Sequence, residues 1–219
     1  MNETSKNNES NNCGLYNKWC TLEDRTSDKP ELDIKEEISK NLNLPKLMDF
    51  FDDNAGILHR SRYHKEDFRT HCLLVIDNML TQYEAGNVSE EAVVAAYLHD
   101  IAKPRTAALN KRNEACFYGH ENVTKNEVAE FLDPDYPGFE IVLDLIHGHM
   151  LPLGVGENTP EPFRGMNQEK LNALLKKHDE QFKKDLTVLS ECDSSASIKS
   201  DDDLPQVEEK ASLVRANII

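Results

Sequence analysis

The sequence predicts an all-α protein that folds as one helical bundle. Between residues 66 and 193 apolar side chains recur every three or four positions, which is the period of a helix with one buried face. Proline, glycine and asparagine interrupt this pattern at several points, so the region divides into separate helices joined by turns. A chain of 219 residues can bury one good hydrophobic core, and we expect a single domain over residues 32–195.

The first stretch, residues 1–31, is expected to be a disordered tail because Asn, Ser, Thr, Asp, Glu and Lys dominate its composition. Docking of the isolated Trp19 region on the domain or on a partner is the alternative. Ordered structure is expected from residue 32 onward, with short helices at residues 34–42 and 45–51. Pro45 suits the first turn of the second of these helices.

Two strong helices are predicted next, over residues 66–83 and 90–98. His71 lies on the apolar stripe of the first helix, so its ring is expected to point inward. The second helix ends at the dipeptide His99-Asp100, where an imidazole and a carboxylate close an otherwise apolar segment. Because an ionised Asp at the edge of a core is costly without a compensating partner, this pair suggests a metal site. A surface hydrogen-bonded pair is the simpler alternative.

Basic residues gather on both sides of this region. A cationic loop beside metal ligands would neutralise a phosphoryl group, whereas a solvated loop needs no function at all. One loop is expected after Asp100, with Pro104 helping to stop the helix before it. The residues concerned are Lys103, Arg105, Lys111 and Arg112 in that loop, and Arg62 and His64 in a cluster at residues 59–65.

Two more histidines fall on predicted helices. His120 is expected at the start of a helix that runs to about residue 132, and a turn follows at residues 133–138. The next helix carries His149 on its apolar face. His147 lies roughly 200° away round the same helix, so His149 is the preferred ligand.

The last part of the chain contributes one buried carboxylate. A long irregular loop is expected at residues 151–165 and a helix at residues 167–177. Asp193 then falls on the apolar stripe of a further helix, which is an expensive position for a carboxylate. Residues 196–219 are treated as an acidic C-terminal extension in which no element is placed.

Five separate segments thus direct a histidine or an aspartate to the apolar side. Unrelated core histidines would need five independent explanations, whereas one metal centre inside a helical bundle explains them together. The expected metal ligands are His71, His99, Asp100, His120, His149 and Asp193.

The order of these residues resembles the signature of the HD-domain metal-dependent phosphohydrolases: a His, then His-Asp, then a distant Asp. Four segments also resemble the HD domain attached to bacterial CCA-adding tRNA nucleotidyltransferases: YHKEDFRTHCLLV at residues 63–75, LHDIAKP at 98–104, FYGHEN at 117–122 and HM at 149–150. No nucleotidyltransferase signature precedes them, and Ala102 stands where that family commonly has Gly.

The resemblance implies an HD-domain bundle that holds one or two divalent ions of manganese, iron, nickel, cobalt or magnesium. His71, His99, Asp100 and Asp193 would bind the first ion, and Asp100 would bridge to a second ion held by His120 and His149. Asp100 and Lys103 would then be catalytic, and phosphate would be contacted by Lys103, Arg105, Arg62 and His64.

Composition limits the partners. The net charge of −15 opposes binding of long nucleic acid, so a nucleotide or another phosphorylated small molecule is the expected ligand. The chain shows no Cys-x-x-Cys pair, leader or membrane-length apolar run, and a cytoplasmic location is expected. Oligomeric state is not indicated.

The leading hypothesis is hydrolysis of a phosphomonoester or phosphodiester in a nucleotide, a cyclic nucleotide or a short RNA end. A non-catalytic, metal-stabilised nucleotide-binding or interaction module is the alternative. A helical bundle without metal is the third reading.

Overall fold

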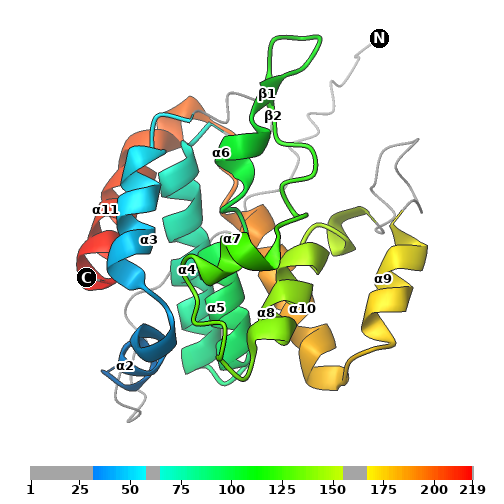
Figure 1. The fold of residues 1–219 in the computed structure, drawn as a ribbon. Helices are drawn as coiled ribbons and strands as arrows, with labels where there is room; N and C mark the ends of the chain where they lie inside the picture. The colour runs from blue at the N-terminus through cyan, green and yellow to red at the C-terminus, as the bar shows by residue number, and fades with distance from the viewer. Residues whose placement is uncertain (1–31, 58–64, 155–166, 219) are drawn as a thin grey trace, which may run out of the picture. The chain divides into compact units, whose positions relative to one another are not determined.

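The computed structural model describes residues 32–57, 65–154 and 167–218, and these residues form the predicted all-α bundle (Figure 1). Glu31–Ile219 make up one compact unit. Within the described residues no helix has the length and apolar character needed to cross a bilayer. Several predictions lie outside the described residues: the tail at 1–31, the contacts of Arg62 and His64, and most of the loop at 151–165.

Within the described residues, helices account for nearly all of the regular structure and are joined by one short hairpin and two 3₁₀ turns. The elements in chain order are α2 (Leu32–Asn41), α3 (Leu44–Asp53), α4 (Phe68–Glu84), α5 (Glu90–Leu98), α6 (Lys103–Thr106), β1 (Ala108–Leu109), β2 (Ala115–Cys116), α7 (Lys125–Ala129), α8 (Phe139–Gly148), η2 (Pro152–Gly154), α9 (Gln168–Leu175), α10 (Glu180–Ser195), η3 (Asp201–Asp203) and α11 (Leu204–Ile218).

Helices α4 and α5 form the centre of the bundle. Helix α4 packs against α3, α5, α10 and α11, while α5 also packs against α8 and α10. Every residue of α5 from Ala92 to Leu98 is buried, as expected of a helix that is apolar on all sides. Because α5 is covered all round, the residues at its C-terminal end, His99 and Asp100, are delivered into the interior.

The two central helices begin at well-defined caps. The side chain of Asp67 accepts the N–H of Thr70 at the start of α4. Ser89 caps α5, and both its backbone N–H and its hydroxyl donate to the buried carboxylate of Asp185 on α10. These bonds satisfy backbone donors that have no partner inside the helix, and they fix the start of α5 to α10.

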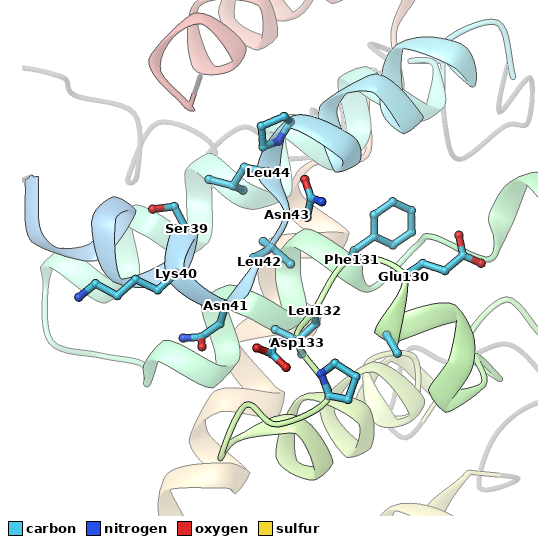
Figure 2. A pocket seen from close by; sticks show the side chains of 13 residues that line it. Ser39, Lys40, Asn41, Leu42, Asn43, Leu44, Glu130, Phe131, Leu132 and Asp133 are labelled. Atoms are coloured by element: carbon cyan, nitrogen blue, oxygen red, sulfur yellow. The ribbon is translucent and has the colours of Figure 1, made fainter.

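The turn between α2 and α3 pairs with the segment after α7. Leu42 and Leu132 form an isolated antiparallel bridge, and the N–H of Asn43 donates to the carbonyl of Phe131 at 2.7 Å. A surface hollow lies beside this bridge (Figure 2). Its walls are residues 39–45 and 129–134, so the hollow shares no residue with the histidines and aspartates singled out above.

Two local predictions were wrong. The chain after Asp100 is not one loop, because Pro104 lies in the first turn of the short helix α6, where its missing N–H costs nothing. The paired strands β1 and β2 follow. The helix expected to start at His120 begins instead at Lys125, where Thr124 forms a capping box with Glu127. His120 therefore lies in the preceding turn, beside Gly119 with its φ of +80°.

Beyond residue 195, where the sequence pattern placed no element, η3 and α11 continue the helical unit. Helix α11 packs on α4, and its buried face is formed at helical spacing by Val207, Ala211, Val214 and Ile218. Arg215 on the same helix binds Asp52 of α3.

A charge on the buried face of α11 is therefore expected to weaken the fold. Val214→Asp places a carboxylate at a position that is 7 % exposed, and we expect a loss of about 2–4 kcal/mol in the free energy of unfolding. Urea denaturation followed by circular dichroism measures it. Leu213→Asp is the matched control, because Leu213 is 62 % exposed and its replacement should change stability by less than about 0.5 kcal/mol. Equal stability of the two variants would contradict the packing of α11.

Candidate metal centre

The six expected metal ligands meet in one buried cluster. His71 lies in the first turn of α4, Asp193 near the end of α10, and His120 in the turn before α7. His99 and His149 directly follow α5 and α8. All six side chains are buried: His71, His99, Asp100, His120, His149 and Asp193.

Their ligand atoms divide into two groups of three. His71, His99 and Asp193 each present one ligand atom within 4.8 Å of the other two, and Asp100, His120 and His149 do the same. Asp100 lies between the groups. Its Oδ2 is 3.4 Å from Nε2 of His71 and 3.1 Å from Nε2 of His99, while its Oδ1 is 3.3 Å from Nε2 of His120.

Three of the histidines are held in the same way. His99, His120 and His149 each direct Nδ1 at the carbonyl oxygen of the residue three positions earlier, at 2.8, 2.8 and 2.6 Å. A carbonyl can only accept, so each Nδ1 carries the proton and each Nε2 presents a lone pair. This is the usual arrangement of histidines that bind metal through Nε2.

The contact between His120 and His149 is the clearest sign that this cluster is suited to hold a cation. Their Nε2 atoms are 3.2 Å apart, although the Nδ1 bonds leave a lone pair on each. Burial lowers the pKa of His149 to about 3, with the charge of His120 acting in the same direction. Burial also lowers the pKa of His120, so both rings are neutral at pH 7. Two facing lone pairs repel each other, and a cation bound between them removes that repulsion.

The donor spacing fits a metal ion. Metal–nitrogen bonds of about 2.0–2.1 Å place two nitrogens on one ion roughly 3.0–3.4 Å apart, which matches the His120–His149 contact. Nε2 of His99 and both oxygens of Asp100 are buried and make no well-aligned hydrogen bond within the described residues. Imidazole and carboxylate together suit divalent first-row transition metals, with no soft thiolate in either group.

Charge favours cation binding as well. Three buried carboxylates surround the centre, from Glu66, Asp100 and Asp193, against one buried ammonium, from Lys103. Burial would raise the pKa of Asp100, but its close contacts with His99 and Lys103 hold that pKa well below its usual range. Burial would also raise the pKa of Asp193, but the hydrogen bond with His71 outweighs this effect and lowers that pKa. Once a metal has displaced the proton of His71, the three carboxylates and the ammonium leave the cluster a net charge of minus two.

The remaining predicted site residues lie in different environments. Nζ of Lys103 is 2.6 Å from Oδ2 of Asp100 and sits over the ring of Phe117. The guanidinium of Arg105 instead binds Glu127 and the carbonyl of Asn122. His147 lies outside both groups, with its Nε2 bonded to the carbonyl of Val123 at 2.9 Å.

Sequence reasoning missed Glu66. This side chain is fully buried, and its Oε1 lies 3.4 Å from Nδ1 of His71. The predicted helix over residues 66–83 included this position, but α4 begins at Phe68 after the Asp67 cap, so Glu66 does not follow the helical period. The sequence offered one indication of its role: Glu66 is a carboxylate that lies five residues before a histidine expected to point inward.

Comparison with known families agrees with this geometry. The HD domain family model matches residues 68–194, which is more than half of the chain. The protein therefore belongs to the HD domain family, whose members are generally metal-dependent hydrolases that bind divalent metals. No curated protein and no solved structure matches the chain.

Removing one ligand of the second group should lower the metal content. We expect His120→Ala to lose the ion shared by Asp100, His120 and His149, and to keep metal at the first group. Elemental analysis of the purified variants measures the change, and a chelator should lower the melting temperature of the wild type. His147→Ala is the matched control because its ring points away from both groups. Equal metal content in both variants would contradict the assignment.

Metal binding should release a proton near neutral pH. Burial and the nearby Lys103 lower the pKa of His71, but its hydrogen bonds to Asp193 and Glu66 outweigh them and raise that pKa to about 9. Below that pH the metal-free ring binds a proton that a metal must displace. Affinity should therefore fall about tenfold per pH unit below about 9, as the proton competes. Titration calorimetry in buffers of different ionisation enthalpy counts the protons, and none released at pH 7 would contradict the prediction.

Proposed function

We propose that this protein is a metal-dependent phosphohydrolase that cleaves a phosphomonoester or phosphodiester in a nucleotide, a cyclic nucleotide or a short RNA end. The observation that carries the proposal is the pair of buried ligand groups that meet at Asp100 inside the part of the chain matched by the HD family. Divalent ions held by His71, His99 and Asp193 and by Asp100, His120 and His149 would supply Lewis-acid activation of a phosphoryl oxygen and would lower the pKa of a water nucleophile.

Asp100 and Lys103 have separate roles in this proposal. The carboxylate of Asp100 contacts His71 of the first ligand group and His120 of the second. It would therefore fix the position of an ion in one group relative to an ion in the other. Lys103 keeps a buried positive charge, since its pair with Asp100 raises its pKa although burial opposes this. An ammonium fixed in a water-poor site is suited to hold a phosphoryl oxygen as negative charge develops on it.

The nucleotide part of the proposal rests on resemblance and charge. The segments around His71, His99 and His120 resemble the HD domain of CCA-adding enzymes, which act at RNA ends. The strongly acidic chain disfavours long nucleic acid, so a small phosphorylated ligand is the better match. Arg105, Arg62 and His64 remain predicted phosphate contacts. A cytoplasmic location is also part of the proposal. It is supported by Cys72, Cys116 and Cys192, which are free thiols, because reduced cysteines are typical of that compartment.

A substrate panel tests the proposal. The 219-residue protein, loaded in turn with manganese, iron, nickel, cobalt or magnesium, is assayed on bis-p-nitrophenyl phosphate, p-nitrophenyl phosphate, 2′,3′-cyclic nucleotides, nucleoside monophosphates and 3′-phosphorylated oligoribonucleotides. We expect metal-dependent turnover of at least one class and its loss in Asp100→Ala. Lys103→Met should lower kcat by about 10²–10³-fold with metal retained.

The control is Lys125→Met, because Lys125 is an exposed lysine that pairs only with exposed Glu140 among the described residues. It should leave turnover unchanged. If the wild type and Asp100→Ala behave alike across the panel, catalysis at this centre is excluded. Tight nucleotide binding by the metal-loaded protein without any product would instead favour a non-catalytic nucleotide-binding module.

A further inference from the structure

We propose that Glu66 is a positioning residue of the metal centre, whose carboxylate holds the ring of His71 with Nε2 turned toward the other ligands. The inference rests on the metal centre invoked in the proposed function. It adds a residue that lies before the segment matched by the HD family, which begins at residue 68.

The contact is an ion pair between two completely buried side chains. Oε1 of Glu66 lies 3.4 Å from Nδ1 of His71, a separation at which the two groups face each other without a well-aligned hydrogen bond. An ionised carboxylate can only accept, so Nδ1 carries the proton. Nε2 then faces Oδ1 of Asp193 at 2.9 Å and Oδ2 of Asp100 at 3.4 Å, inside the cluster.

His71 needs a carboxylate because of its place in the fold. The other three histidines use a carbonyl three residues earlier, and two of these carbonyls belong to the ends of α5 and α8, where carbonyls lack a helical partner. His71 lies at the opposite end of a helix, in the first turn of α4. Carbonyls there are already used by the helix, so an acceptor must come from the chain before it.

The other oxygen of Glu66 is fixed from outside the centre. Oε2 accepts the backbone N–H of Ile198 at 2.9 Å and that of Lys65 at 3.0 Å. The Lys65 N–H also donates to the carbonyl of Ile198 at 2.8 Å, so the segments at Lys65 and Ile198 bind each other as well as Glu66. Ile198 lies beyond residue 194, where the family match ends. The geometry of His71 therefore depends on chain segments flanking that match on both sides.

Glu66→Gln separates this role from simple packing. The amide oxygen is expected to stay on the two backbone donors, which turns the NH₂ group toward Nδ1–H of His71, donor against donor. The ring must then move its proton to Nε2 or rotate away. We expect Zn²⁺, used as a diamagnetic probe, to bind about 10–100-fold more weakly by titration calorimetry, as for other carboxylates that orient metal-binding histidines.

Glu121→Gln is the matched control. Oε2 of Glu121 lies 3.8 Å from Nδ1 of His120, but that N–H is already donated to the carbonyl of Phe117 at 2.8 Å. Its Zn²⁺ affinity should equal that of the wild type. A folded Glu66→Gln protein with wild-type affinity would overturn the inference and leave the metal centre standing, whereas a wild type without Zn²⁺ binding would overturn both.

A measurement on the wild type covers the case in which Glu66→Gln does not fold. In Zn²⁺-loaded protein labelled with ¹⁵N-histidine, the nitrogen chemical shifts of His71 report which ring nitrogen carries the proton. We expect a proton on Nδ1 and metal on Nε2. Metal on Nδ1 of His71 would overturn the inference, because Glu66 could then not accept from that nitrogen.

Discussion

The interaction on which the rest of the site depends is the contact between the Nε2 atoms of His120 and His149. Each ring is locked by its Nδ1 bond to a backbone carbonyl, so neither can turn its lone pair away from the other. At 3.2 Å, in the interior, two lone pairs repel unless a positive charge lies between them. The fold holds this unfavourable arrangement in place, and a bound cation converts it into a favourable one.

What holds the arrangement is a set of helix ends. His99 and His149 directly follow α5 and α8, where the last carbonyls lack helical partners and can accept Nδ1–H. The opposite end of α5 is bound to Asp185 of α10. Helix α10 also supplies Asp193. The Nδ1 hydrogen bonds of His99 and His149 therefore do two things: they orient the rings, and they give a partner to carbonyls at the ends of α5 and α8. This makes the centre rigid.

Periodicity predicted much of this and failed for definite reasons. His71 and Asp193 lie on the helices α4 and α10, and His149 directly follows α8, so the spacing of apolar residues in these helices defines the inward face. His120 lies in a turn, where no such period exists. Helix α11 was not predicted because its buried face is small, built from Val207, Ala211, Val214 and Ile218 against α4, and because it directly follows the acidic run Asp201–Asp203.

Charge balance connects the ligand set to the proposed substrate. The three buried carboxylates and the single ammonium of Lys103 leave a net charge of minus two, which one divalent ion neutralises. A second ion, for which Asp100, His120 and His149 offer a complete group, leaves a net charge of plus two. Excess positive charge in a buried site is costly unless an anion joins it. A phosphate ester dianion has the charge that restores neutrality, so binding of the second ion and of a phosphorylated ligand should favour each other.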